Sequence, residues 1–499
     1  MTSQQKEAHM QFNLLNEPWI PCLGNDGKLR RVGVREALTQ AGTIRQIAAS
    51  NPMDRLATLR FLLALLYWCK GNPPARANAA LGDSFPAEWF AKLDEHEGYF
   101  NLLGKGKRFY QYRGESETPL TANYLVHEIP TGTKLWHFRH ATDGVDGLCP
   151  ACCALGLLRL PLFATSGGRG KPPGINAKPP LYVIPVGDSL AETLRLSWCS
   201  APSLGTPAWE KPDISLPKTG EVPLLTGLTW LPRRVWLGNP EESEATCISC
   251  GRKNRLITSS VFAGIGSMKT DDETPNRLWR DPHVIYDNSG KSKVTTPHAR
   301  NALGAADAGA GQWASIVAGM FQQQSAPAAT DLPNQDSWAE GGKYSIWVVG
   351  FSTVQNDKYL EAIEYTLSLP ASVGKPVPAV QLLERWQEEN ARLARKVWPP
   401  DEQRSSRKHP EMASAIAAIR PHVEDKVSAK VGELLAGGDT AWQKAASAYR
   451  PMMEVIARSL SPGFTTAAVE RRKRIADTLP DMTQTGPAKK APRKKGGTT

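Results

Sequence analysis

Cys149-Pro-Ala-Cys152 and Cys247-Ile-Ser-Cys250 are the stretches of sequence that decide how the body of this chain is built. In a Cys-x-x-Cys pair the two-residue spacer lets both sulfur atoms face one metal ion, and two pairs supply the four thiolates of a tetrahedral zinc site. The segment between the pairs, residues 153–246, is longer than a compact zinc ribbon. We therefore expect a structural zinc ion that joins two distant segments and closes a long loop.

Several interpretations of the cysteines remain open from the sequence. The pairs can also arise by chance or form a buried cluster that binds nothing, and Cys153 can replace Cys152 as a ligand. Cys22, Cys69 and Cys199 are interpreted as ordinary core or surface residues. If the two pairs do bind one ion, four thiolates leave no coordination position open for a substrate, which disfavours metal catalysis.

Length and composition indicate an intracellular globular protein. The chain has 499 residues, enough for two or three domains, and its eight cysteines are too sparse for a disulfide scaffold. Residues 1–16 lack the apolar core of a secretory signal, and the longest apolar run, residues 61–69, is far shorter than a membrane span. We therefore expect a cytoplasmic protein without a membrane partner.

The chain is basic, and the position of the charge matters more than its sum. The formal net charge is +11, but residues 484–499 hold five lysines and arginines and no acid, so the rest of the chain carries +6. This proline-containing tail lacks the apolar surface needed to order itself, and we predict that it is disordered. The charge of the remainder is compatible with nucleic-acid binding but does not require it.

Residues 12–365 mix short apolar runs with frequent proline and glycine. Three runs, residues 12–15, 19–23 and 181–186, are predicted strands because turn residues bound them. The elements follow no regular strand–helix–strand alternation, so this region is predicted to be an α+β mixture.

One strong helix interrupts these strands. Asn51 is its expected cap, Pro52 fits the first turn, and Gly71 ends it. Its apolar stripe is formed by Leu56, Leu59, Leu62, Leu63 and Leu66.

From about residue 375 the apolar residues recur every three or four positions, which is typical of helices alone. Four such segments predict a four-helix bundle that serves for docking and carries no chemistry. We therefore predict the α+β class, with a large irregular mixed body stapled by a four-cysteine zinc site at residues 1–370, an all-α four-helix bundle at 371–483, and a disordered basic tail at 484–499.

Sequence motifs favour a binding protein over an enzyme. No Gly-x-x-x-x-Gly-Lys-Ser/Thr phosphate loop, His-Glu-x-x-His or Gly-x-Ser-x-Gly occurs. Two glycine-bearing stretches stand out instead, Thr165-Ser-Gly-Gly-Arg-Gly-Lys-Pro-Pro173 and Val348-Val-Gly-Phe-Ser-Thr-Val-Gln-Asn-Asp-Lys358. Glycines let a backbone approach another surface closely, although each stretch alone also fits an ordinary connector or turn.

An ordered set of motifs then points to a known family. The opening Phe12-Asn-Leu-Leu-Asn-Glu-Pro-Trp-Ile-Pro21 resembles that of the CasA family, the large subunits of the type I-E CRISPR surveillance complex Cascade. The two cysteine pairs, the glycine loop, Leu278-Trp279, the Gly350-Phe351 stretch up to Gln355 and the terminal helices follow in that family's order. The resemblance therefore spans nearly the whole chain.

The resemblance implies that the protein recognises a protospacer-adjacent motif (PAM) in double-stranded DNA and starts the strand separation that lets a guide RNA form an R-loop. In the family a glycine loop, a lysine finger and a β-hairpin with a glutamine wedge meet the motif, largely from the minor groove. By position these are Gly167, Gly168, Arg169 and Gly170 for the loop, Lys269 for the finger, and Gln355 with Asn356 for the hairpin.

Some positions depart from the family pattern. The stretch before Leu278 is longer than expected, so Lys269 is the first choice for the finger and Lys253 remains an alternative. Val354 stands where a polar hairpin residue is expected, which suggests an altered motif preference. Phe138 and His140 lie in a segment that matches a mobile loop engaging the motif and the guide end.

The resemblance also implies partners. These are the double-stranded target and its displaced strand, the guide RNA held by the complex, the other Cascade subunits (backbone, small and guide 5′-end subunits) and a helicase–nuclease effector. The chain itself is expected to be no enzyme, with zinc in a structural role. A zinc-stabilised RNA-binding structural protein is the alternative, and a zinc-dependent nuclease is disfavoured because no paired carboxylates accompany the cysteines.

Overall fold

Helices and small sheets alternate irregularly in the computed structural model of this chain. It describes residues 11–74, 84–114, 117–128, 147–164, 171–176, 180–217, 219–265, 277–284, 343–354, 358–370 and 463–476, with residues 447 and 451.

The chain divides into two compact units. One comprises Met1–Ala306, Gln323–Ser337 and Ser345–Thr366, and the other Asp307–Gln322, Trp338–Tyr344 and Leu367–Thr499. We call the first unit the body. Most of the predicted four-helix bundle lies outside the described residues, so that prediction and the predicted domain limits stay predictions.

The helix predicted after Asn51 is confirmed as α2, Pro52–Lys70. The Asn51 side chain accepts a hydrogen bond from the N–H of Met53 at 2.7 Å, and Gly71 ends the helix with a φ of +87°. The predicted leucine stripe is buried, but almost all of the remaining helix surface is buried too, including Asp54 and Arg60. A helix buried on all sides lies at the centre of a core.

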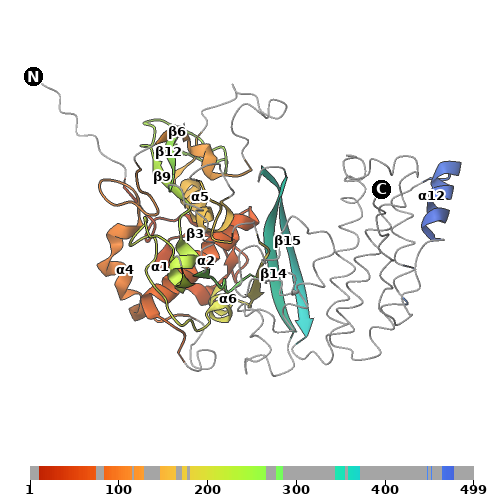
Figure 1. Cartoon of the computed structure of the whole chain (residues 1–499), viewed down its shortest axis with the longest axis horizontal. Helices are drawn as coiled ribbons and strands as arrows, with labels where there is room; N and C mark the ends of the chain where they lie inside the picture. The colour runs from red at the N-terminus through yellow and green to blue at the C-terminus, as the bar shows by residue number, and fades with distance from the viewer. Residues whose placement is uncertain are drawn as a thin grey trace, which may run out of the picture. The chain divides into compact units, whose positions relative to one another are not determined.

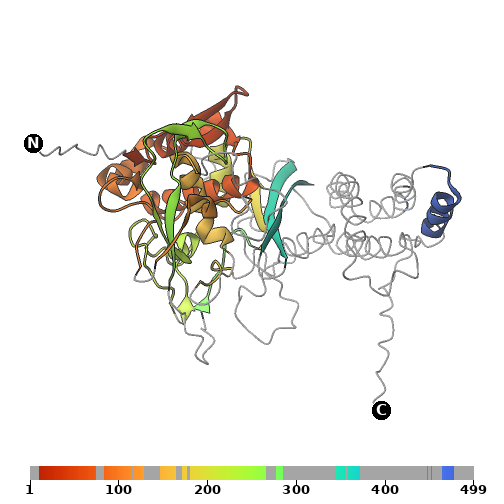
Figure 2. The ribbon, with the colours of Figure 1, turned by 90° about the horizontal axis from the view of Figure 1, so that it is seen from above.

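The other helices in the described part of the chain are shorter than α2. The α-helices are α1 (Val34–Thr39), α4 (Ala91–Glu95), α5 (Pro150–Phe163), α6 (Leu190–Ser197), α7 (Leu224–Thr229) and α12 (Thr466–Ala476). The 3-10 helices are η1 (Ala41–Thr43), η2 (Ala87–Phe90), η3 (Glu97–Phe100) and η4 (Ala122–Leu125). α2 packs against α5, α6 and α7, and it runs through the middle of the body in Figure 1 and Figure 2.

The strands form small, mostly antiparallel sheets. Among the described residues, three sheets have three strands, in the orders β3-β2-β4, β6-β12-β9 and β15-β14-β7. Their strands are β2 (Ile20–Gly24), β3 (Leu29–Val32), β4 (Ile44–Ile47), β6 (Thr118–Thr121), β7 (Tyr182–Val186), β9 (Arg233–Leu237), β12 (Ser259–Gly264), β14 (Lys343–Val354) and β15 (Lys358–Pro370). The two-stranded pairs are β1 (Phe12–Asn13) with β5 (Asn101–Leu103), β10 (Glu244–Thr246) with β11 (Lys253–Arg255), and β13 (Arg277–Leu278) with β8 (Gly220–Glu221).

The predicted strands are found, one of them shortened. The runs 19–23 and 181–186 correspond to β2 and β7. The run 12–15 holds only the two-residue β1, because the side chain of Asn13 accepts a hydrogen bond from the N–H of Leu15 at 2.9 Å. Such a bond turns the chain out of the extended conformation.

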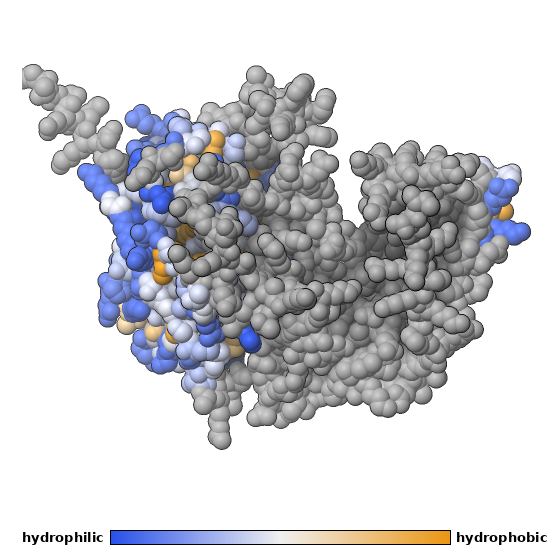
Figure 3. Space-filling view, viewed as in Figure 1, coloured by the Kyte–Doolittle hydropathy of each residue, from blue (hydrophilic) through white to orange (hydrophobic). Residues whose placement is uncertain are grey.

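Aromatic rings fill the core beside α2. Phe61 packs edge-on against Phe109 and Trp209, with ring centroids 5.2 and 5.8 Å apart, and Trp68 meets Trp209 at 5.7 Å. The described surface in Figure 3 is mostly hydrophilic, with apolar residues scattered over it. Within the described ranges, the structure has no helix with the length and apolar character needed to cross a membrane.

The cap of α2 gives a first prediction. Asn51→Ala removes the acceptor for the N–H of Met53 and should cost about 1 kcal/mol of stability, lowering the midpoint of thermal unfolding. Asn51→Asp keeps an acceptor at this position and is the matched control, measured by the same thermal unfolding assay. Equal midpoints for Asn51→Ala and the wild type would show that the cap contributes nothing.

Candidate metal centre and the neighbouring ion pairs

The structure brings the four predicted cysteines together. The sulfur atoms of Cys149, Cys152, Cys247 and Cys250 all lie within 4.8 Å of one another, and three of these residues are buried. The Sγ atoms of Cys149 and Cys250 are 3.7 Å apart. Zinc–sulfur bonds of about 2.3 Å in a tetrahedron put the sulfurs about 3.8 Å apart, so this donor set fits zinc.

Local sequence sets the first pair at the start of α5. Cys149 is the residue that caps α5, Pro150 occupies the first position, and Cys152 lies in the first turn. Proline favours this place because it has no N–H to leave unbonded. The positive end of the helix dipole lies here and stabilises thiolates.

A tight hairpin presents the second pair between β10 and β11. The N–H of Cys247 donates to the carbonyl of Arg252 at 2.8 Å, and the N–H of Gly251 donates back to the carbonyl of Cys247 at 2.9 Å. Gly251 has a φ of +69°, a conformation that glycine adopts without strain. The turn therefore closes on itself and directs Cys247 and Cys250 to one side.

Backbone hydrogen bonds join the two pairs directly. Leu148 and Ile257 exchange bonds of 3.0 and 2.8 Å, and the N–H of Ile248 donates to the carbonyl of Gly147 at 3.2 Å. The N–H of Cys149 also donates to the Sγ atom of Cys247 at 3.3 Å. The segments on either side of residues 153–246 are thus held together before any metal is considered.

The thiols influence one another's ionisation. A hydrogen bond with Cys152 is the largest of several effects that lower the pKa of Cys250 to about 6, and one with Cys149 lowers the pKa of Cys247. Hydrogen bonds with Cys149, Cys247 and Cys250, together with burial, raise the pKa of Cys152. Four thiolates this close repel one another, so full ionisation of the cluster needs a cation among them.

Cys153, the alternative ligand, lies outside the cluster. Its thiol is fully buried and points to the carbonyl of Leu148, with a sulfur–oxygen distance of 3.9 Å. Bound zinc at Cys149, Cys152, Cys247 and Cys250 would stabilise the fold and leave no site open for a substrate.

The other predicted site residues lie outside the described residues. This applies to the DNA-binding set Phe138, His140, Gly167, Gly168, Arg169, Gly170, Lys269, Gln355 and Asn356. The alternative finger, Lys253, is described: it is exposed in β11, at the hairpin that carries Cys247 and Cys250. The proposed roles of all these residues therefore stay proposals.

Sequence reasoning missed a buried ion-pair cluster between α2 and α5. The Nε atom of Arg159 donates to Asp54 at 2.6 Å, and its two terminal nitrogens donate to Glu128 at 2.5 and 3.0 Å. Burial opposes the charge of Arg159, but Asp54 and Glu128 outweigh it and raise the arginine's pKa. The sequence signal for these ion pairs is the presence of charged residues within otherwise apolar helices, because a buried charge requires a partner of opposite charge.

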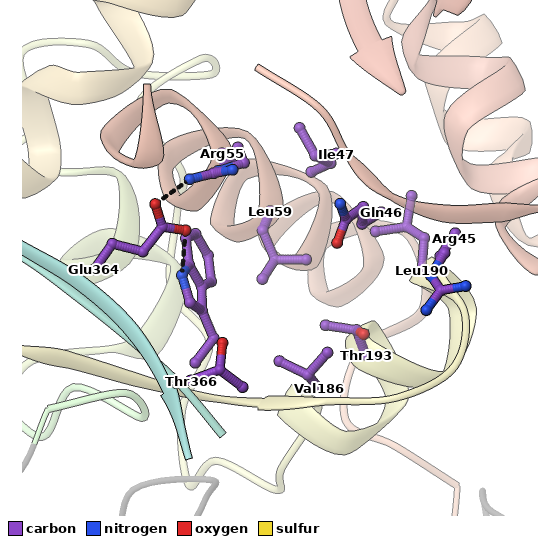
Figure 4. A pocket seen from close by; sticks show the side chains of 11 residues that line it. Arg45, Gln46, Ile47, Arg55, Leu59, Val186, Leu190, Thr193, Glu364 and Thr366 are labelled. Carbon is purple, nitrogen blue, oxygen red and sulfur yellow. Dashed lines mark hydrogen bonds and ion pairs between the residues drawn. The ribbon is translucent and has the colours of Figure 1, made fainter. Parts of the chain in front are cut away.

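A cavity of about 150 Å³ lies beside α2, β4, α6 and the β14–β15 strands (Figure 4). Arg55 forms an ion pair with Glu364 and stands 5.6 Å from the ring centroid of Trp347. The indole N–H of Trp347 donates to the same carboxylate at 2.9 Å. The polar wall of the cavity is therefore an internal contact that ties both strands to α2.

The sequence matches the family model described as CRISPR-associated protein Cse1 over residues 13–484. The chain belongs to the Cse1 family. A curated relative, the CRISPR-associated protein CasA/Cse1 of Thermus thermophilus, is 28% identical over 339 residues. That match covers 59% of this chain and 64% of the relative.

Solved Cse1 structures have the same fold. The crystal structure of Cse1 from Acidimicrobium ferrooxidans has a TM-score of 0.66 at 19% identity, covering 94% of this chain and 98% of the other. A chain of a structure described as a CRISPR RNA-guided surveillance complex has a TM-score of 0.63 at 14% identity, covering 94% and 99%. The family that the motif order indicated is thereby confirmed.

The cysteine cluster of this Cse1-family chain gives a second prediction. Wild-type protein should purify with about one zinc per chain, and Cys152→Ala should lose most of it together with folded yield, because binding energy at a structural site is folding energy. Cys153→Ala is the matched control: it removes an adjacent buried thiol outside the cluster, so it should retain zinc. Elemental analysis that finds no zinc in the wild type, with stability unaffected by chelators, would contradict the prediction.

Proposed function

We propose that this chain is the large subunit of a guide-RNA-directed DNA surveillance complex. In this role it recognises a protospacer-adjacent motif in double-stranded DNA, promotes strand separation and R-loop formation, and helps to recruit a helicase–nuclease. The observation that carries the proposal is the Cse1 family match over residues 13–484. The similarity to a chain from a CRISPR RNA-guided surveillance complex supports it.

The proposed motif reading uses simple chemistry at three segments. The backbone at Gly167, Gly168 and Gly170 can follow the floor of the minor groove, because glycine has no side chain to obstruct it. The amine of Lys269 can donate to base and phosphate acceptors. Gln355, which lies in sequence between β14 and β15, can compensate for lost stacking at the first opened base pair.

Recognition of a short motif is sufficient for the protein in a guide-directed complex. Pairing between guide RNA and target strand reads the remaining sequence, so the protein needs to recognise only the motif and stabilise the opened duplex. The formal net charge of the chain, +11, favours association with the negatively charged target and its displaced strand.

The proposed role includes no reaction on this chain. A zinc ion at the cysteine cluster would be structural, because four sulfurs complete its coordination. Cleavage is therefore assigned to the helicase–nuclease partner, and the bundle is assigned to docking on other subunits of the complex. A zinc-stabilised RNA-binding protein is the competing function.

A third prediction tests motif reading. In the complete guide-loaded complex, Lys269→Ala and Gln355→Ala should each weaken binding to a duplex with a correct motif by about tenfold, the effect of losing one specific base contact. Binding to complementary single-stranded DNA should change little, because no duplex has to be opened. Gel-shift titrations on both substrates measure the two effects, and equal losses on both would assign the residues to folding or general phosphate affinity.

A fourth prediction tests the division of labour. The guide-loaded complex with matched duplex, magnesium and ATP, but without helicase–nuclease, should open the strands and leave them uncut. Permanganate footprinting detects the opening, and denaturing gels detect any cut. Cleavage that disappears when this chain is mutated would refute the non-enzymatic role, and single-stranded RNA binding with no duplex preference would support the competing function.

A further inference from the structure

A fully formed ion pair lies in the middle of the body, between α2 and the segment 277–284. The terminal nitrogens of Arg60 donate to the two carboxylate oxygens of Asp281 at 2.7 and 2.8 Å. Arg60 is 4% exposed and Asp281 1%, and the guanidinium also stands 5.1 Å from the ring centroid of Tyr182. Burial opposes the charge of Asp281, but Arg60 outweighs burial and lowers the pKa of the carboxyl. Two parallel hydrogen bonds fix the orientation of the guanidinium relative to the carboxylate as well as the distance between them.

Hydrogen bonds extend the pair in two directions. The side-chain amide of Asn176 donates to Asp281 at 3.0 Å, and the indole N–H of Trp279 donates to the amide oxygen of Asn176 at 3.0 Å. Tyr182, next to Arg60, donates to the carbonyl of Leu162 at 3.2 Å. Burial and Arg60 lower the pKa of His283 to about 3, so this ring stays neutral and its Nδ1 atom accepts from Arg60 at 2.9 Å.

The members of this network come from the flanks of two segments singled out in the sequence. Leu162 precedes Gly167 and Asn176 follows Gly170, while Trp279 follows Lys269. The chain on both sides of the glycine stretch and the chain after Lys269 therefore meet at one buried network. No sequence pattern connects Asn176 with Trp279, which lies 103 residues further along the chain.

Neighbouring residues of α2 hold two further segments. Arg55 is tied to Glu364 and Trp347 on the two strands that flank Gln355. Asp54 is linked through Arg159 to Glu128, which lies ahead of Phe138 in the chain. Three charged residues within two turns of α2 are thus linked, directly or through one intervening side chain, to chain that precedes or follows each segment to which motif reading is assigned.

We propose that α2 is the common anchor of the chain that flanks the motif-reading segments, and that Arg60, through Asp281 and Asn176, is the positioning residue that fixes residues 171–176 relative to residues 277–284. This inference rests on the proposed function. It adds that motif discrimination depends on buried groups that touch no DNA.

The physical reason is preorganisation. Segments held at their bases by a rigid, buried network lose less conformational freedom when they meet DNA, and misplacement by about an ångström removes directional contacts. Buried hydrogen bonds serve this purpose because each bond specifies an orientation that apolar packing leaves open.

Trp279→Phe is the test variant, because it removes the indole N–H that bonds Asn176 and leaves a smaller aromatic ring at a position where the indole packs against Gly227. Trp209→Phe is the matched control. Trp209 is also buried, and its indole N–H has no hydrogen-bond partner among the described residues. Both variants make the same chemical change in the same body, but only one touches the network.

The measurement is the ratio of affinities of the complete guide-loaded complex for a duplex with the correct motif and a duplex with an altered motif. Trp279→Phe should lower this ratio about fivefold, the equivalent of one buried hydrogen bond. Binding to complementary single-stranded DNA and the zinc content should stay at wild-type values. Trp209→Phe should leave the ratio unchanged.

An unchanged ratio in folded Trp279→Phe protein would overturn the inference and leave the proposed function standing. A wild-type complex that binds both duplexes equally would overturn the proposed function, and the inference with it. Should Trp279→Phe fail to fold, Asn176→Ala removes the same hydrogen bond from its other side. A reduced affinity ratio in Asn176→Ala would then support the inference, and an unchanged ratio would overturn it. Loss on single-stranded DNA equal to that on duplex would show a merely structural role.

Discussion

Arg60 has to keep its charge in the centre of the body, and the surrounding structure follows from that requirement. A guanidinium at 4% exposure is tolerated only when a carboxylate faces it and its donors are bonded. Asp281 meets this need, which determines where the segment 277–284 crosses α2. Asn176 donates to Asp281 and the ring of Tyr182 packs against the guanidinium, so the chain after the glycine stretch and the start of β7 come to the same place.

The cysteine cluster and the ion pairs constrain the body in different ways. The cluster joins the start of α5 to the β10–β11 hairpin, so it closes the chain over residues 153–246 at one end of α5. Arg159, further along α5, ties the helix to α2 through Asp54. A metal site holds its ligands by strong bonds in a fixed geometry, whereas an ion pair depends on the exclusion of water around it. Together they fix α5 at two points, at its start to the β10–β11 hairpin and further along to α2.

A protein that recognises and opens DNA needs placement more than reactivity. Backbone contacts in a groove and a wedge between base pairs supply small energies, and these distinguish sequences only when the contacting atoms are held in place. Under the proposed function, this need accounts for a body in which the buried Arg60 and Arg159 are bonded to carboxylates. The contacts of Arg55 with Glu364 and Trp347 serve the same purpose, because they hold β14 and β15 against α2.

The sequence by itself determined the features that depend on local spacing. Asn51, Pro52 and Gly71 predict α2 because caps and first-turn prolines act within a few residues. The spacing of the two cysteine pairs predicts that four sulfurs converge, as they do. Only the tertiary structure decided that Cys153 stands apart from the cluster and that Arg60 of α2 finds its partner in Asp281, 221 residues away. Pairing between distant residues depends on how elements pack, and no periodicity or motif along the chain records it.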